Sequence, residues 1–290
     1  MAWGPRTKET LLSLPSMVWL IGLFLVPTLL VFAISFRPST PFGGVGEGWT
    51  LETIRGLANP NYPTIIWRTV WISLSTTAIC LTLAVPCAYF MARAPVRWRS
   101  FLVMLVIIPF WTNFLIRIFA WKIMLHPEGL LKKFLLMLHL VEPRTILMYN
   151  EGAVLLVLVY SYLSFAILPI YAATEKFDFG LLEAAQDLGA TRLRALVQIF
   201  LPGISRGMIT AALVVFIPAL GSYVIPEIVG GPSSEMIGNK IAQRVFVDRN
   251  LPHASGLSAL LTLAVVVPML LVLMLQRRSP SGLSKPEGRA

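Results

Sequence analysis

Charged residues are scarce in this sequence of 290 residues. Asp, Glu, Lys and Arg make up 13% of the chain, whereas hydrophobic residues make up 56%. A soluble domain carries about 25% charged residues, so the sequence indicates a membrane protein. The longest polar stretches are about 30 residues, too short for a soluble domain of ordinary size.

Cysteine is nearly absent, and catalytic motifs are missing altogether. Cys80 and Cys87 stand seven residues apart in one apolar stretch, about 10 Å along a helix, which is too far for a disulfide. The three histidines, His126, His139 and His253, lie in predicted loops without a second metal ligand at helical spacing. The chain contains no G-x-x-x-x-G-K-[ST] phosphate loop and no G-x-S-x-G elbow. We therefore expect no catalytic residue, metal site or cofactor in this chain.

Six stretches are long and apolar enough to cross a bilayer, which takes about 20 residues. They lie at about 16–36, 67–91, 101–121, 153–172, 205–226 and 254–275. The sequence thus predicts an all-α, polytopic membrane protein with six transmembrane helices. We expect a single permease domain over 1–290, with a core at about 67–275 and an extra N-terminal span at about 16–36.

Acidic residues are absent from the middle of all six predicted spans. Carriers that couple transport to protons or sodium usually place carboxylates there, so their absence argues against that class. A standalone carrier or channel for a small solute nevertheless remains the alternative function.

The net charge is +10, but the basic residues are scattered among loops, which argues against nucleic-acid binding. The loop with Arg93, Arg97 and Arg99 is short and free of acids, so we place it in the cytoplasm. With six spans, both termini then lie on the cytoplasmic side.

A patterned, charged segment follows the fourth predicted span. In "EAAQDLGATRLRALVQIFLP" (183–202), Glu183 and Asp187 share a polar side, opposite an apolar stripe of Leu181, Ala184, Ala185 and Leu188. Gly189 suits a left-handed turn after the first helix. Thr191 suits the N-cap of a second helix, whose apolar stripe is Leu193, Leu196, Val197 and Phe200. The pattern predicts a helix–turn–helix with one face for its own bundle and one for a partner, and we expect the spans to bury none of this loop.

This segment resembles the EAA loop of bacterial ABC importer permeases of the MetI-like type. The matching residues are Glu183, Ala184, Ala185, Gly189, Ile199, Leu201 and Pro202. The resemblance implies a type I ABC importer permease fold in the bacterial inner membrane. It makes the loop at about 174–204, including Asp187, the cytoplasmic coupling loop that docks on an ATPase.

Three further stretches, 107–125, 223–231 and 236–241, are similar to B-type permease subunits of spermidine/putrescine importers. The resemblance implies a non-catalytic subunit for polyamine uptake, surrounded by membrane lipid. Its implied partners are an ATPase dimer that holds ATP and Mg²⁺, a second related permease and an external substrate-binding protein.

A polyamine path would need aromatic faces and carboxylates, because the cargo is a polycation. The substrate-path candidates are Phe110, Trp111, Asn113, Tyr160, Tyr162, Tyr223, Glu151 and Glu227. Packing or a membrane-interface belt explains each aromatic, taken singly, better than a path role does. Helix–helix contact explains Asn113, whose buried amide would need a partner, as well as a ligand contact does. Arg117 would repel a cationic cargo, so we expect it to pair with an acid or a carbonyl, or to reach the interface.

Overall fold

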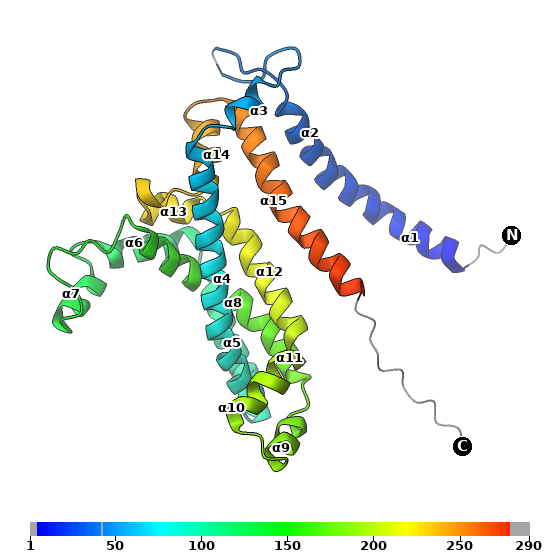
Figure 1. The fold of residues 1–290 in the computed structure, drawn as a ribbon, viewed down its shortest axis with the longest axis vertical. Helices are drawn as coiled ribbons and strands as arrows, with labels where there is room; N and C mark the ends of the chain where they lie inside the picture. The colour runs from blue at the N-terminus through cyan, green and yellow to red at the C-terminus, as the bar shows by residue number, and fades with distance from the viewer. Residues whose placement is uncertain (1–4, 42, 279–290) are drawn as a thin grey trace. The chain divides into compact units, whose positions relative to one another are not determined.

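The computed structural model describes residues 5–41 and 43–278 (Figure 1). Within them the backbone is mostly helical, and the single β pairing is an isolated bridge between Ser39 and Val45. Helices satisfy every backbone hydrogen bond within one segment, which hydrocarbon requires. The predicted all-α fold is confirmed. Two compact units share the chain: Met1–Tyr62 with Ile241–Ala290, and Pro63–Lys240.

The first unit combines the N-terminal helices with the C-terminal helix. Its elements are α1 (Pro5–Leu20), the π-helical turn η1 (Ile21–Leu25), α2 (Val26–Ile34), α3 (Glu52–Gly56) and α15 (Leu251–Arg278). The long helix α15 packs against α2 and α3. The Tyr62 hydroxyl lies 2.7 Å from Nε2 of His253, and Arg244 donates to the same hydroxyl, which ties this unit together beside α3.

The second unit holds the remaining helices. They are α4 (Asn61–Arg93), α5 (Val96–Trp111), α6 (Phe114–Leu125), α7 (Leu130–Met137), α8 (Glu151–Glu175), α9 (Gly180–Asp187), α10 (Arg192–Ala195), the π-helical turn η2 (Leu196–Phe200), α11 (Leu201–Gly203), α12 (Ser205–Leu220), α13 (Val224–Val229), the 3₁₀ turn η3 (Pro232–Ser234) and α14 (Ile237–Phe246). The first residues of α4 and the part of α14 from Ile241 on belong to the first unit.

The centre of the second unit is α8, which packs along α12 and also touches α5, α6 and α13 (Figure 1). The two long helices approach closely at Gly207, where a Cβ atom would lie 2.4 Å from Cβ of Ala173 and 2.9 Å from the Pro169 carbonyl oxygen. Small residues at such crossings let membrane helices pack by van der Waals contact.

Three helical segments are long and apolar enough to cross a membrane by themselves: Ser13–Ile34, Asn61–Arg93 and Glu151–Glu175. Two bent pairs, Val96–Trp111 with Phe114–Met137 and Arg192–Gly203 with Ser205–Leu220, bring the count to as many as five. The helix α15 covers the range of the sixth predicted span. Its segment Leu251–Val267 is apolar but shorter than a full span. The polytopic architecture agrees with the sequence, and the number six stays a prediction.

Two predicted spans are not continuous helices. The span predicted at 101–121 breaks after Trp111, where Thr112 is extended and the chain turns by 85°. Pro109 weakens the last turn of α5 because it removes a backbone donor. The span predicted at 205–226 ends at Leu220, and α13 starts anew at Val224.

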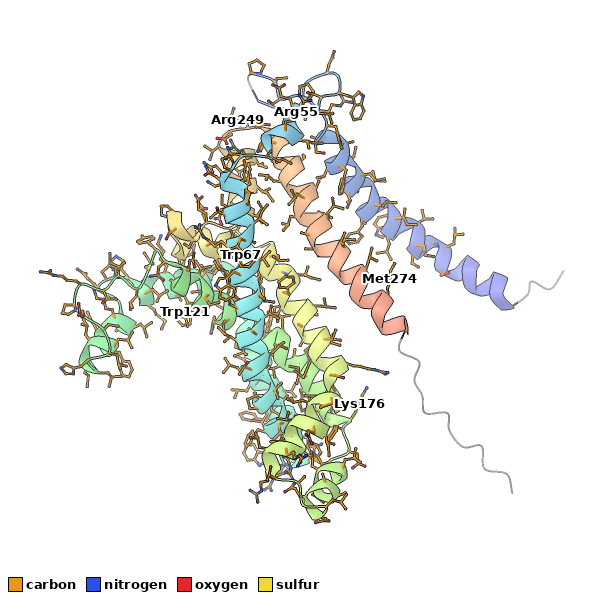
Figure 2. All side chains as sticks on the ribbon, in the orientation of Figure 1. Arg55, Trp67, Trp121, Lys176, Arg249 and Met274 are labelled. Atoms are coloured by element: carbon orange, nitrogen blue, oxygen red, sulfur yellow. The ribbon has the colours of Figure 1, made fainter. Side chains whose placement is uncertain are left out.

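Large apolar side chains stay exposed along the spans. Trp67, labelled on α4 in Figure 2, is 70% exposed, and Trp71 one turn later is 55% exposed. Lipid or another subunit can cover such side chains, whereas water would not stabilise them.

Candidate functional site

The coupling loop (174–204) forms the predicted helix–turn–helix. Helix α9 ends at Asp187, Gly189 adopts a φ of +89°, and Oγ1 of Thr191 accepts a hydrogen bond from the Arg194 amide at 3.3 Å. A Cβ atom on Gly189 would meet nothing within 4 Å. The glycine is therefore required by the backbone conformation and not by crowding.

Four aromatic rings hold this loop on the ends of α4 and α8. Phe200 packs edge-to-face against Tyr89 (5.2 Å between ring centroids) and Phe177 (5.3 Å), and it stacks on Phe179 at 6.4 Å. Tyr89 and Phe177 each contact Phe179 edge-to-face as well. Phe200 is 1% exposed, so the cluster is the buried anchor of the loop.

The same core buries one side of both short helices. Leu182, Ala185 and Ala195 belong to the hydrophobic cluster that includes Met91 of α4 and Ile170 of α8. The expectation that the spans bury none of this loop is wrong. Aromatic residues on both sides of α9 draw the loop back onto the bundle.

The predicted apolar stripes lie mostly on the outer side. Leu181 (51% exposed), Leu188 (90%), Leu193 (73%) and Val197 (51%) are open, and we call these four residues the exposed apolar face. Leu182 and Ala185 provide the buried side of α9 instead. The side expected to face the bundle is therefore mostly exposed. Four large apolar side chains stay uncovered on a loop whose other side is firmly packed.

The other residues of the EAA pattern divide between surface and core. Glu183, Ala184 and Asp187 are exposed on α9. Ile199 and Leu201 are partly buried against the aromatic core. Pro202 is exposed in α11, just before the 69° bend into α12.

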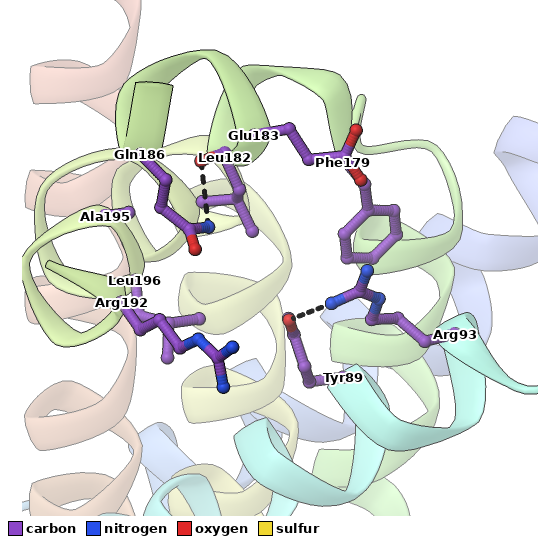
Figure 3. A pocket seen from close by; sticks show the side chains of 9 residues that line it. All are labelled: Tyr89, Arg93, Phe179, Leu182, Glu183, Gln186, Arg192, Ala195 and Leu196. Carbon is purple, nitrogen blue, oxygen red and sulfur yellow. Dashed lines mark hydrogen bonds between the residues drawn. The ribbon is translucent and has the colours of Figure 1, made fainter. Parts of the chain in front are cut away.

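A pocket of about 370 Å³ lies between the coupling loop and the end of α4 (Figure 3). The Arg93 guanidinium sits over the rings of Tyr89 (5.7 Å) and Phe179 (5.6 Å) and donates to the Tyr89 hydroxyl at 2.9 Å. Gln186 and Arg192 line the other wall. Arg93 thus connects a spanning helix to the loop.

The bend between α5 and α6 places three path candidates in different surroundings. Phe110 packs edge-to-face on Phe165 at 4.5 Å, whereas Trp111 is 75% exposed. Asn113 is exposed, and its Oδ1 accepts from the amides of Leu115 and Ile116. The expectation of a buried Asn113 amide in search of a partner is wrong, because this side chain caps α6.

Arg117 follows on the first turns of α6. Its guanidinium lies 5.8 Å from the centre of the Phe110 ring. Its Nε is buried and has no hydrogen-bond partner among the described residues. Within that part of the chain, neither an acid nor a carbonyl accepts from Nε, and the expectation that Arg117 reaches the interface stays a prediction.

Tyr160, Tyr162 and Glu151 are engaged within α8 and its neighbours. Tyr160 packs on Trp121 at 5.2 Å, and the Tyr162 hydroxyl donates to the Pro218 carbonyl at 3.4 Å. Glu151 forms an ion pair with Arg68 at 3.1 Å, so its charge is compensated.

The last two candidates, Tyr223 and Glu227, come together beside the break between α12 and α13. Tyr223 is 44% exposed and Glu227 is also exposed. Asn239 of α14 donates to the Tyr223 carbonyl at 3.2 Å and to Oε2 of Glu227 at 2.7 Å. Within residues 5–41 and 43–278, no group of three or more His, Cys, Asp or Glu could hold a metal ion.

Residues 84–285, which include the coupling loop and the path candidates, match the model of the family described as binding-protein-dependent transport system inner membrane component. The chain belongs to this family. Membership agrees with the fold and with the loop pattern that the sequence predicted.

Relatives in this family have been named for their transport systems. The spermidine/putrescine transport system permease protein PotB of Haemophilus influenzae is 36% identical over 249 residues, which cover 86% of this chain and 87% of the relative. PotB of Escherichia coli K12 is 35% identical over 254 residues, covering 88% and 92%. The inner membrane ABC transporter permease protein YdcU of the same strain is 31% identical over 236 residues, covering 77% and 72%.

Solved structures confirm the family fold. A chain of a bacterial ABC transporter involved in the import of the acidic polysaccharide alginate superposes with a TM-score of 0.67 at 17% identity. The match covers 96% of this chain and all of the other. A second structure of a bacterial alginate ABC transporter, in complex with a pentasaccharide-bound periplasmic protein, gives a TM-score of 0.69 at 17% identity.

The sequence does not predict three residues that the structure places at the pocket and beside Glu227. The sequence gives no signal for Tyr89, and Arg93 predicts only the orientation of its loop in the membrane, whereas both residues line the pocket beside the coupling loop. Asn239 lies in the stretch 236–241, whose resemblance to B-type permease subunits assigns it no role. A polar residue within an apolar segment is a signal for such a role, but its partners depend on the fold.

We expect Phe200→Ala to release the coupling loop from the bundle. Truncating a buried Phe costs about 3–5 kcal/mol, and here the loss falls on the ring that three other aromatics contact. Hydrogen exchange of the amides in 177–204 should accelerate. The control is Phe134→Ala, where the ring is 57% exposed and its loss should leave the loop unchanged. Equal exchange in the Phe200 variant and the wild type would contradict the anchor.

Proposed function

We propose that this protein is the transmembrane permease subunit of an ATP-driven ABC importer, with a polyamine such as spermidine or putrescine as cargo. The coupling loop carries the proposal, because its exposed apolar face is open while its other side is clamped by the aromatic core. Covering a large apolar side chain contributes about 1.5–3 kcal/mol, so four of them offer a docking surface of useful strength.

The partner for this face is the ATPase subunit. A rigid loop passes a displacement on to the spans, whereas a loosely attached loop would absorb it. The rings around Phe200 and the Arg93 contact provide that rigid attachment to α4 and α8. ATP and Mg²⁺ are bound by the ATPase, and this chain is a non-catalytic subunit without a cofactor of its own.

The complete importer contains an ATPase dimer, a second related permease that completes the path, and an external substrate-binding protein. The two PotB relatives belong to systems named for spermidine and putrescine, and the family is named for its dependence on a binding protein. The chain lies in the bacterial inner membrane, surrounded by lipid. Both termini are cytoplasmic, on the side of the basic loop at Arg93–Arg99.

Two path candidates expose a group that attracts a cation. Glu227 keeps an exposed carboxylate next to Tyr223, and Trp111 presents an exposed ring for cation–π contact. Phe110, Tyr160 and Tyr162 pack against neighbours and shape the surrounding wall.

Reconstitution into vesicles tests the proposed function. We expect radiolabelled spermidine to accumulate only when this chain is combined with its ATPase, the second permease and the binding protein, and only with hydrolysable ATP. A non-hydrolysable ATP analogue serves as the control. Uptake by the lone chain without nucleotide would overturn the importer and favour a standalone carrier or channel.

Gly189→Asp tests the coupling loop. Position 189 has a left-handed backbone, which costs a non-glycine residue about 1 kcal/mol. A Cβ atom there meets nothing within 4 Å, so the bundle should fold. The added carboxylate joins Glu183 and Asp187 and obstructs docking on the ATPase. We expect co-purification of the ATPase to weaken and ATP-driven uptake to be lost, with a milder loss for Glu183→Ala.

Gly189→Ala is the matched control, because it carries at least the same backbone strain without the acid. It should retain more uptake than Gly189→Asp. An aspartate variant that keeps both uptake and ATPase binding at wild-type levels would refute the role of the loop.

A further inference from the structure

Asn239 is a buried polar residue whose side chain faces a carboxylate. It is 6% exposed and lies in the first turn of α14. Burying an amide is unfavourable unless its hydrogen bonds are made. Its partners therefore indicate what the residue is for.

Both polar atoms of the Asn239 amide are engaged. Its Oδ1 accepts from the Met236 amide at 3.2 Å. Its Nδ2 donates to the Tyr223 carbonyl at 3.2 Å and to Oε2 of Glu227 at 2.7 Å. Reversing the amide would set a donor against the Met236 donor and an acceptor against two acceptors, so one orientation is selected.

The backbone that carries Asn239 is fixed from two directions. The Ile237 amide donates to Oγ1 of Thr69 on α4 at 2.8 Å. At Gly238, a Cβ atom would lie 2.7 Å from the Ser222 carbonyl oxygen, so α14 presses directly on the break between α12 and α13. Asn239 can hold Glu227 in one place because its own position is set by these contacts.

Glu227 differs from the neighbouring carboxylates in its partner. Glu235 pairs with Lys240 at 2.7 Å, and Glu151 pairs with Arg68 at 3.1 Å. Glu227 is held through Oε2 by an uncharged amide, which orients the carboxylate without neutralising it. The group is exposed, and among residues 5–41 and 43–278 no partner engages Oε1, which can accept a further hydrogen bond.

We propose that Asn239 is a positioning residue that holds the Glu227 carboxylate for a primary ammonium group of a polycationic cargo. This inference rests on the proposed function, since it names the chemistry of a step in the same transport path. An ammonium group donates three hydrogen bonds and carries the positive charge that the Asn239 amide does not offer to Glu227. An anionic solute would be repelled here, and a neutral donor would gain a hydrogen bond without the charge attraction, so the pair selects for cations.

The test uses the full importer in vesicles and compares spermidine transported with ATP hydrolysed, both per assembled complex. Glu227→Gln keeps the size of the side chain and removes its charge. We expect it to lower the ratio of transport to hydrolysis about tenfold, as for the loss of a charge-assisted hydrogen bond. Asn239→Ala should lower the ratio about three- to tenfold, because the carboxylate is then present but no longer oriented.

Two further variants separate positioning from general structure. Asn239→Leu keeps about the same size and removes the donor without adding a charge, so it should reproduce the alanine result even if Asn239→Ala lowers the yield of complex. Glu235→Gln removes a nearby carboxylate that is already paired, and it should leave the ratio unchanged. A purely structural defect would lower hydrolysis and transport together and would not change the ratio.

The double variant decides whether Asn239 acts through Glu227. In the Glu227→Gln background, Asn239→Ala should cause no further fall in the ratio. An equal fall in both backgrounds, or an unchanged ratio in every Asn239 variant, would overturn the proposal. A wild-type importer that fails to move spermidine would instead refute the proposed function before any variant is compared.

Discussion

The packing of three aromatic rings around Phe200 is the interaction on which the coupling loop depends. Phe177, Phe179 and Phe200 belong to the loop, whereas Tyr89 belongs to the last turns of α4. Because these rings and Leu182 occupy the buried side, Leu181 and Leu188 are left on the outer side. The same contacts thus explain both the rigidity of the loop and the apolar surface that it presents.

The carboxylates of the second unit differ in the partner that compensates their charge. Glu151 and Glu235 have cationic partners there, Arg68 and Lys240 respectively. Glu227 has the neutral amide of Asn239 instead, and its charge stays available. A few uncompensated groups in otherwise apolar surroundings can determine which solute is accepted, because desolvation makes each of them costly without a partner.

Composition and periodicity were sufficient to predict the helical membrane fold and the helix–turn–helix at Gly189, since both follow from local rules. The breaks at Trp111 and Leu220 were missed because apolar composition continues across them. The inner side of α9 was also misjudged: Leu181 and Leu182 are equally apolar, and only the position of Phe200 and its neighbours decides which is buried. Asn113 and Asn239 show the same limit, since one caps a helix at the surface and the other is buried and anchors an exposed carboxylate.

Labelling of a single cysteine at the most exposed position of the loop tests the central claim most directly. Cys80 and Cys87 are first replaced by alanine, and Leu188→Cys, where the leucine is 90% exposed, is allowed to react with a water-soluble maleimide. Binding of the ATPase should slow the reaction about tenfold or more, because the core of an interface excludes water. The reaction of Leu130→Cys, at a leucine 77% exposed on α7, should not change. Equal reaction rates at position 188 with and without bound ATPase would contradict the account.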